Sequence, residues 1–392
     1  MREKTALVLS GGGARAAYQV GVLKALVRLQ REYVSEDAPI PFSILCGTSA
    51  GAINAAALAG RADRFRDAVD AIAQVWQGLR AEQIYRADVA GIARTGAKWL
   101  TAMSVGWLSG RNSRLVPRSL LDNTPLIELL PRWACLEGLP LQLEKGHLRA
   151  LGIGVSSYTS GEHLTFFQSA DDESGYTRTQ RLAVPVQLRV EHLVASAAIP
   201  FVFPAQRIEH VEHAGWYGDG SMRQIAPISP AIHLGAQRVL IVGVGRMHEP
   251  ARQVDRNGDY PSLAQIGGHA LSSIFLDSLT VDIERMERIN RTLALMSDDQ
   301  RAASTLVPVQ ALVIAPSERI DEIAARHQTS LPKPVRALLR GVGASGAKGD
   351  VRGAAFASYL LFESSFTQEL MALGEWDTLA KRSLIRSFFG WE

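Results

Sequence analysis

The chain has very little cysteine and no long hydrophobic run. It contains two cysteines in 392 residues, so disulfides cannot be what holds a chain of this length together. This usage predicts a reducing, intracellular setting. No stretch of about 18 uncharged apolar residues occurs, which argues against a membrane-spanning helix, and the apolar run at residues 6–9 is too short for a secretory signal. We therefore expect a cytoplasmic protein that is soluble or peripheral on the inner membrane face.

The chain also lacks an excess of charge of one sign. Its 42 basic and 39 acidic side chains give a formal net charge of +3. No long Lys/Arg stripe with interleaved aromatic residues occurs, which argues against a dedicated nucleic-acid binder. Hydrophobic residues make up 47% and charged residues 21% of the chain, which indicates a globular protein with a sizeable core rather than a disordered one.

The first 60 residues alternate short apolar runs with helical patterns. Residues 5–10 and 42–46 are typical of buried strands that stop at glycines, and the segments 17–33 and 50–60 behind them have helical character. This βαβα order predicts a parallel sheet covered by helices. The same pattern returns later, with further apolar strands expected at residues 238–243 and 307–315.

A G-x-S-x-G sequence, Gly47 to Gly51, follows the second expected strand. Between a strand and a helix this sequence puts Ser49 on a tight turn, where the flanking glycines let the backbone pass and the hydroxyl protrude. The pentapeptide alone also fits an ordinary strand-to-helix turn. With the strand before it and the helix behind it, the pattern favours a nucleophilic serine.

A serine nucleophile needs a base, and the sequence offers a carboxylate rather than a histidine. Histidine is the usual partner, but His210 and His213 lie in a charged stretch typical of a solvated surface. Their spacing fits a metal site in principle, although no third ligand accompanies them. Asp219 lies between two glycines and next to aromatic residues that can desolvate it, which would raise its pKa and make it a stronger base. The alternative is a plain Asp-Gly turn.

Three consecutive glycines, residues 11–13, join the first strand to the first helix. Such a loop exposes backbone N–H groups at a helix N-terminus, which suits a phosphate or the oxyanion of an acyl-transfer intermediate. With Ala16 the loop fits the dinucleotide pattern G-x-G-x-x-A. That pattern wants an acidic residue at the end of the second strand, where this chain has Ser49. A P-loop is excluded because no Lys-Ser or Lys-Thr follows the glycines.

Together these motifs supply a nucleophile, a base and oxyanion donors, and the sequence resembles the bacterial patatin-like phospholipases. Four blocks in the same order carry the resemblance, namely residues 11–15, 47–51, 195–204 and 219–220. They lie within residues 5–60 and 190–245, and no motif covers the rest of the chain.

The resemblance implies a three-layer α/β/α fold and hydrolysis of lipid acyl esters by a Ser–Asp dyad. By position, Ser49 would be the nucleophile and Asp219 the base. The oxyanion hole would use the amides of Gly11, Gly12 and Gly13, with Arg15 as a supporting charge and Gly47 and Gly51 flanking the nucleophile. The chain departs from the family pattern at Ala16, where many relatives have glycine, and at Ser221, where glycine or alanine is usual.

We expect a catalytic core over residues 1–250 and a mostly helical extension, 251–392, packed on it. Within the core, residues 61–145 read as a helical insertion and a candidate lid or interface element. Basic residues and tryptophans gather in its centre, and we expect lipid contacts from Arg94, Lys98, Trp99 and Trp107. The same helix could equally bury its apolar side on the core or in a dimer.

The resulting hypothesis is a phospholipase A or lysophospholipase that acts on phospholipid or another acyl ester, with peripheral membrane contact and no nucleic-acid partner. Serine-dyad chemistry calls for no metal and no organic cofactor. Two alternatives stay open: an acyltransferase that uses the same acyl-enzyme, and a membrane-binding regulatory protein with weak catalysis. A homo-oligomer is also open.

Overall fold

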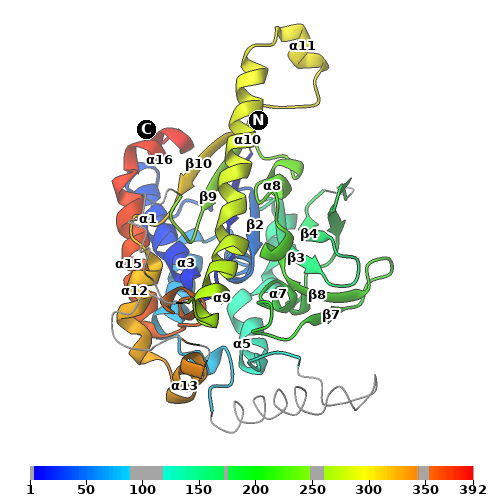
Figure 1. Ribbon diagram of the computed structural model, residues 1–392. Coiled ribbons are helices and arrows are strands. Elements are labelled where there is room, and N and C mark those ends of the chain that lie inside the picture. The colour runs from blue at the N-terminus through cyan, green and yellow to red at the C-terminus, as the bar shows by residue number, and fades with distance from the viewer. Residues whose placement is uncertain are drawn as a thin grey trace.

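The structure is a computed structural model in which ten strands form one twisted sheet between helices (Figure 1). It describes residues 4–88, 118–171, 175–247, 260–341, 343 and 353–391. The strands are β1 (Thr5–Leu9), β2 (Ile44–Thr48), β3 (Ala150–Ser157), β4 (His163–Ser169), β5 (Thr177–Arg178), β6 (Arg181–Pro185), β7 (Gln206–Ile208), β8 (Gly215–Asp219), β9 (Arg238–Val242) and β10 (Gln310–Ile314).

The helices alternate with these strands and then dominate the C-terminal part. They are α1 (Ala17–Tyr33), α2 (Ala50–Ala59), α3 (Phe65–Gly78), α5 (Thr124–Ala134), α6 (Leu139–Glu144), α7 (Val190–Ser196), α8 (Ser229–His233), α9 (Leu263–Ser272), α10 (Ser278–Ala294), α11 (Asp298–Ala303), α12 (Ile320–His327), α13 (Lys333–Gly341), α14 (Ala354–Ala357), α15 (Ser364–Ala380) and α16 (Arg382–Phe389).

The sheet is mainly parallel in its centre. Its strand order is β10-β9-β1-β2-β3-β4-β6-β5, with β8 also paired to β3 and β7 to β8. The pairs from β10 to β3 are all parallel, while β3 runs antiparallel to both β4 and β8. The α/β class with a mainly parallel sheet, expected from the sequence, is confirmed, and so are the strands expected near residues 5–10, 42–46, 238–243 and 307–315.

Side chains of the central strands alternate between two apolar layers, one on each face of the sheet. In β1, Leu7 and Leu9 belong to the larger cluster with α1, α2 and α3, whereas Ala6 and Val8 belong to a smaller cluster with α8 and α10. This alternation follows from the two-residue period of a strand. A sheet that is apolar on both faces must be covered by helices on both, which makes the fold a three-layer α/β/α sandwich.

The segments whose place the sequence left uncertain pack on this sandwich. Helix α15 lies against α1 (Figure 1), and Gly21 of α1 and Gly374 of α15 allow the backbones to touch, because a Cβ at either glycine would meet the other helix within 2.2 Å. The C-terminal part also adds β10 to the sheet edge. In the described parts of residues 61–145, Trp76 and Trp133 are buried in the larger apolar cluster. The division into core, insertion and extension remains a prediction.

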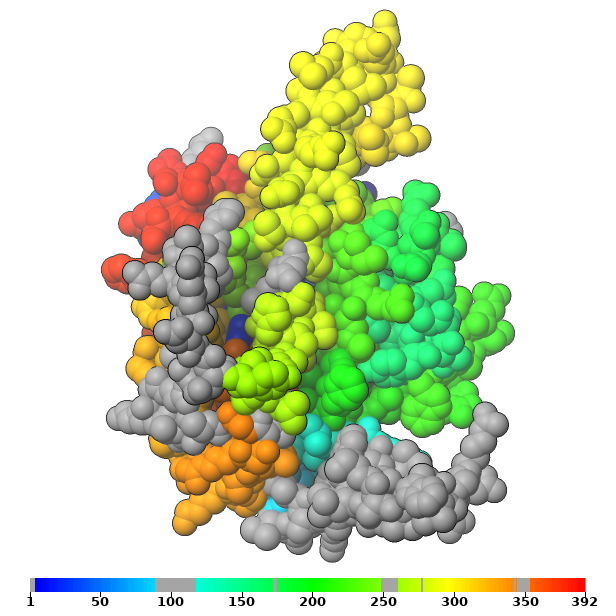
Figure 2. Space-filling view, in the orientation of Figure 1, coloured from blue at the N-terminus to red at the C-terminus, as the bar shows by residue number. Residues whose placement is uncertain are grey.

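One helical hairpin departs from the compact shape. The end of α10 and the whole of α11 project from the body as a narrow arm, which Figure 2 shows in yellow. The other described elements pack closely together. No helix in the described part of the chain is long and apolar enough to cross a bilayer.

The sheet register brings the three candidate loops to one edge. In the parallel pair of β1 and β2, Leu9 lies opposite Gly47, so the glycine loop and Ser49 leave the sheet side by side. Thr48 pairs with Gly154 of β3, and the next residue of β3, Val155, pairs with Asp219 at the end of β8. Ligand sites of open α/β sheets form at the carboxyl ends of the parallel strands, and the candidate residues occupy that edge.

Candidate active site

Ser49 occupies a strained turn between β2 and α2. Its backbone has φ 57° and ψ −132°, and its side chain is 1% exposed. A non-glycine residue in such a conformation is held there by its surroundings and costs about 1–3 kcal/mol. The flanking glycines make the turn possible, because a Cβ at Gly47 would lie 2.5 Å from the Gly51 carbonyl oxygen and one at Gly51 would lie 2.4 Å from that of Leu9.

A second buried serine fixes the backbone of Ser49. The Ser49 N–H donates to Ser196 Oγ at 2.8 Å, and that hydroxyl donates to the Gly154 carbonyl at 2.7 Å. Ser196 is completely buried at the end of α7. It thereby connects the turn at Ser49 to β3. The sequence shows Ser196 only as one small residue in a block of small residues, so its positioning role needs the tertiary structure.

We expect Ser196→Ala to lower both the melting temperature and kcat. The change leaves the buried Ser49 amide without an acceptor, which costs about 1–3 kcal/mol of folding stability, and it loosens the turn that places the Ser49 hydroxyl, the candidate nucleophile. A tenfold fall in kcat corresponds to about 1.4 kcal/mol. Thermal unfolding and ester-hydrolysis kinetics check this, with Ser169→Ala on the far end of β4 as the control. A Ser196→Ala protein that matches the wild type in both would contradict this role.

Asp219 ends β8 as a buried carboxylate that is only partly hydrogen-bonded. Its Oδ1 accepts the Ser221 N–H at 3.0 Å. No described residue gives Oδ2 a hydrogen bond of ordinary geometry, although this atom is buried. Burial raises the pKa of Asp219 to about 6, while the nearby hydroxyls of Ser49 and Ser221 and the Ser221 amide lower it. The Ser49 hydroxyl is therefore a neighbour of the carboxylate, and such contacts often tighten only when substrate binds.

The aromatic surroundings of Asp219 differ in part from the sequence expectation. Trp216 is 45% exposed, whereas its neighbour Tyr217 is buried. A third aromatic residue, Tyr158, packs against Gly218: its hydroxyl oxygen would lie 2.4 Å from a Cβ placed there, and burial together with the charge of Asp219 raises the pKa of Tyr158. Burial surrounds the Asp219 carboxyl with a low-dielectric environment. This environment disfavours the charged form and so raises the pKa of Asp219.

The glycine loop presents backbone donors at the same sheet edge. No described residue accepts a hydrogen bond from the N–H of Gly11 or Gly12, whereas the amide of Ala14, two residues after Gly12, donates to the Tyr359 carbonyl at 3.0 Å. Gly13 has φ 55° and touches Tyr359 so closely that a Cβ would lie 2.3 Å from the same carbonyl oxygen. The C-terminal part thus holds the loop in place from outside.

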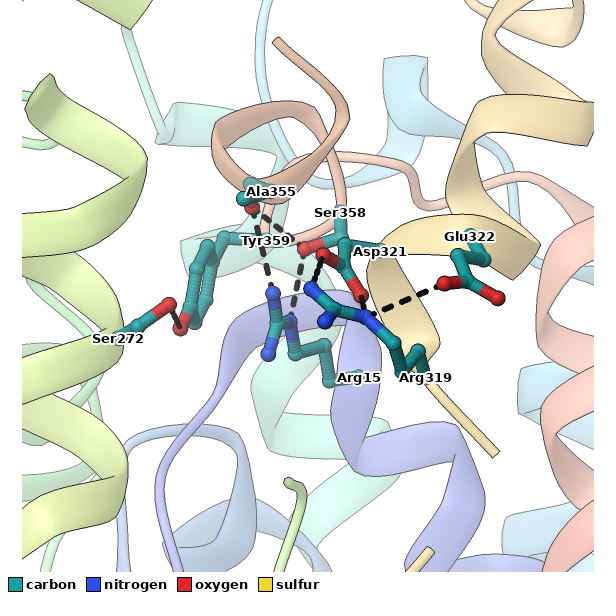
Figure 3. A network of polar contacts seen from close by, with 8 residues as sticks. All are labelled: Arg15, Ser272, Arg319, Asp321, Glu322, Ala355, Ser358 and Tyr359. Atoms are coloured by element: carbon teal, nitrogen blue, oxygen red, sulfur yellow. Dashed lines mark hydrogen bonds and ion pairs between the residues drawn. The ribbon is translucent and has the colours of Figure 1, made fainter. Parts of the chain in front are cut away.

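Arg15 belongs to this support, because its side chain contacts the C-terminal part. Its Nε donates to Ser358 Oγ at 2.7 Å, another guanidinium nitrogen donates to the Ala355 carbonyl at 3.4 Å, and its guanidinium lies 4.2 Å from the Tyr359 ring centroid (Figure 3). These contacts all lie in residues 355–359. Among the described residues, neither Ser49 nor Asp219 contacts the Arg15 side chain. These contacts place Arg15 between the glycine loop and the C-terminal part, and its role as a supporting charge stays a prediction.

A buried histidine, which the sequence does not single out, braces the turn after Asp219. His163 Nδ1 lies 3.2 Å from the Gly220 carbonyl, and burial lowers its pKa to about 4. The ring is therefore neutral at physiological pH, and Nδ1 is the nitrogen that donates. His210 and His213 stack on each other in a more exposed loop, and no group of three His, Cys, Asp or Glu side chains in the described part of the chain could hold a metal.

A small apolar pocket of about 20 Å³ lies beside Ser49. Its lining is almost wholly aliphatic and aromatic and comes from segments far apart in the sequence. The lining residues are Gly13, Ser49, Ala50, Ile53, Trp76, Ile84, Leu126, Trp133, Ala197, Ile199, Phe203 and Phe362. No sequence motif marks it, because only the fold brings these residues together. A strained serine, a buried carboxylate, available amides and an apolar pocket are the groups that acyl transfer from an apolar acid requires.

A comparison with models of known protein families identifies the family of this chain. The family described as "Patatin-like phospholipase" matches residues 7–232, which is more than half of the chain. This protein belongs to the patatin-like phospholipase family. Membership confirms the family that the four sequence blocks indicated, and family members act on phospholipids or related acyl esters.

Individual relatives match only in part. A segment of 57 residues is 53% identical to Lysophospholipase nte1 of Aspergillus terreus (strain NIH 2624 / FGSC A1156), which is 14% of this chain and 3% of that protein. Among solved structures, human GIVD cytosolic phospholipase A2 is 11% identical with a TM-score of 0.44 and covers 99% of this chain and 62% of its own. VipD from Legionella pneumophila is 14% identical with a TM-score of 0.34, over 95% and 67%. The chain spans about two thirds or less of the length of each of these relatives.

The four residues expected to contact lipid, Arg94, Lys98, Trp99 and Trp107, lie outside the described residues. The structure therefore leaves the basic, tryptophan-bearing segment as a prediction. The described residues on either side of it meet: the Arg86 N–H donates to the Asp122 carbonyl at 2.8 Å, and the Leu121 N–H donates to the Val202 carbonyl at 2.8 Å.

Proposed function

We propose that this chain is a lipid acyl hydrolase that cleaves carboxyl esters of phospholipids or lysophospholipids. Ser49 is the nucleophile, Asp219 the base, and the amides of Gly11, Gly12 and Gly13 the oxyanion donors. The observation that carries the proposal is the apolar pocket, because it opens at a serine whose hydroxyl neighbours a buried carboxylate of raised pKa. Family membership supports the same chemistry.

The geometry accounts for each step of acyl transfer. Asp219 takes the proton of Ser49 Oγ as this oxygen attacks the ester carbonyl carbon, and the amides of the glycine loop donate hydrogen bonds to the new oxyanion. The tetrahedral intermediate collapses when the ester C–O bond breaks, and the alcohol leaves with the proton from Asp219. Water then attacks the carbonyl carbon of the acyl-enzyme while Asp219 takes its proton. The bond to Ser49 Oγ breaks, Ser49 regains the proton from Asp219, and the free acid is released. A base with a pKa near 6 is largely ionised at neutral pH and still accepts a proton effectively.

The proposal includes where in the cell the reaction takes place. An acyl hydrolase must reach lipid at a surface, and the basic segment with Arg94, Lys98, Trp99 and Trp107 suits an anionic bilayer. We place the protein in the cytoplasm and peripherally on the membrane, and among bacterial patatin-like proteins on account of the four sequence blocks. No metal or organic cofactor takes part in the proposed steps.

Hydrolysis of a short-chain nitrophenyl ester and of mixed phospholipid vesicles tests the proposal. We expect release of free acid from both, and the matched Ser49→Ala protein controls for contaminating esterases. Adding an alcohol acceptor and analysing the products separates hydrolysis from transfer, since a transferase would form a new ester at the expense of free acid. Absence of both products from the folded wild-type protein would refute the proposed activity.

A further inference from the structure

The projecting arm leaves the body at the edge of the sheet opposite the candidate active site. The Asn290 side chain of α10 exchanges two hydrogen bonds, of 2.7 and 3.0 Å, with the backbone of Val309, which directly precedes β10. The first residues of β10, β9 and β1 are paired in register, so this is the amino edge of the parallel strands. Ser49 and Asp219 lie at the carboxyl edge. The arm therefore stands apart from the candidate active site (Figure 2).

A groove of about 450 Å³ runs along the arm between α10 and the chain that returns to β10. We call it the arm groove. Ile289, Leu293 and Met296 line it at helical spacing along α10, and Leu306 lines it from the returning chain. The Leu306 side chain is 53% exposed. Apolar surface that gathers on a projecting arm instead of in the core indicates contact with another molecule.

Charge is divided between the two ends of the arm. Arg285 and Arg288 line the arm groove at its base, and no Asp or Glu lines it. The tip carries Asp298 and Asp299 in the first turn of α11. Arg285 and Asp298 each pair with a side chain three residues away in their own helix. Arg288 and Asp299 are exposed and form no ion pair with another described residue, so both are available to a partner.

Two such arms are complementary when they lie side by side and antiparallel. Arg288 precedes Leu293 in the sequence and Asp299 follows it at a similar spacing. A twofold axis near Leu293 sets the basic base of each arm against the acidic tip of the other and brings the two arm grooves face to face. Exposed ion pairs contribute little by themselves, so the apolar contact supplies most of the affinity and the charges fix the antiparallel direction. Glu284 and Glu287 of α10 do not line the groove.

The position and the charge of the arm argue against a bilayer as its partner. A membrane bound at the amino edge of the sheet would not present lipid to Ser49 at the carboxyl edge. The acidic tip, with Asp298 and Asp299, is also repelled by an anionic lipid surface. A second copy of this chain, by contrast, supplies both the acidic and the basic half of the contact from the same arm.

We propose that the chain forms a twofold dimer in which the arm grooves of two copies pack together. Ile289, Leu293, Met296 and Leu306 of each copy form the apolar centre of the interface. The basic base of each arm meets the acidic tip of the other. The two carboxyl edges of the sheets stay outside the interface. The dimer does not depend on the proposed hydrolysis.

Sedimentation velocity of the full chain between about 0.5 and 100 µM tests the dimer. A contact limited to the arms is small, so we expect a reversible equilibrium in which the dimer dominates only at the upper concentrations. Leu306→Glu places a charge in the apolar centre and should raise the Kd of the dimer at least tenfold. Leu263→Glu, at a residue 71% exposed at the start of α9, is the matched control and should keep the wild-type Kd. Both positions are exposed, and thermal unfolding checks that both variants are folded.

A charge exchange between two variants tests the antiparallel direction. Arg288→Glu puts an acid opposite the acidic tip of its own copy, and Asp299→Lys puts a base opposite the basic base, so each variant alone should dimerise at least tenfold more weakly than the wild type. In an equal mixture the introduced glutamate of one variant faces the introduced lysine of the other. We therefore expect the mixture to form a heterodimer with a Kd within about threefold of the wild-type value.

Three results would overturn the arm dimer. The first is a wild-type chain that sediments as a monomer up to about 100 µM. The second is a dimer whose Kd is unchanged by Leu306→Glu and by both charge variants, because it must then use another surface. The third is a monomeric wild-type chain that floats with anionic phosphatidylserine vesicles and loses this binding on Arg288→Glu, which would assign the arm to a membrane.

Discussion

Replacing Ser49 by alanine should lower kcat for ester hydrolysis by about 10⁴- to 10⁶-fold, the range seen when a serine hydrolase loses its nucleophile. In the proposed mechanism the Ser49 hydroxyl accepts the acyl group, and no covalent intermediate can form without it. The backbone turn should persist, because its contacts to Ser196 and to the flanking glycines do not use the Ser49 side chain. Steady-state kinetics and intact-mass detection of an acyl-enzyme measure the effect.

A second substitution at the same position shows whether the turn is strained. Ser49→Gly also removes the hydroxyl, but glycine adopts φ 57° without a steric penalty. We therefore expect both variants to be inactive and the glycine variant to be more stable than the alanine variant by about 1–3 kcal/mol. Denaturant unfolding measures the difference. Activity of Ser49→Ala within tenfold of the wild type would exclude Ser49 as the nucleophile.

The core of the fold could be predicted because its signals are local. β1, β2 and the helices behind them are contiguous apolar or periodic segments that end at glycines, and the register between β1 and β2 follows once both are parallel neighbours. The loops at residues 11–13 and 47–51 could be predicted for the same reason, because in each of them the glycines lie directly between a strand and a helix in the sequence. Asp219 belongs to the same site by register, because β8 pairs with β3 beside β2.

The rest of the site depends on contacts between distant segments, which carry no local pattern. Ser196 and His163 act through single hydrogen bonds to Ser49 and to the residue after Asp219, and nothing in their own sequence surroundings marks those partners. Arg15 follows the glycine loop in sequence, yet its side chain turns to residues 355–359. Spacing along the chain places a residue in a loop, but packing decides where its side chain points.

Substituting Asp219 by asparagine should remove the base and yet stabilise the folded protein at alkaline pH. For the wild type, kcat/KM should rise with pH and level off above the pKa of about 6. The asparagine variant should be about 10²- to 10⁴-fold slower at pH 7, the usual contribution of a general base, and should lose that rise. Kinetics between pH 5 and pH 9 measure both effects, with Asp298→Asn on the exposed α11 as the control.

The stability effect has a defined sign and pH window. Burial raises the folded-state pKa of Asp219 from 3.8 to about 6, so the folded protein holds its proton over a range in which the unfolded chain has lost it. The wild-type free energy of unfolding therefore falls by about 3 kcal/mol, on account of this group, as the pH rises from about 4 to 6. It stays at this lower value at higher pH. Asparagine cannot ionise, so Asp219→Asn should be the more stable protein at pH 8 and should match the wild type near pH 4. A variant that is less stable than the wild type at pH 8 would show that the carboxylate is stabilised in the fold, and with it that Asp219 is not a desolvated base.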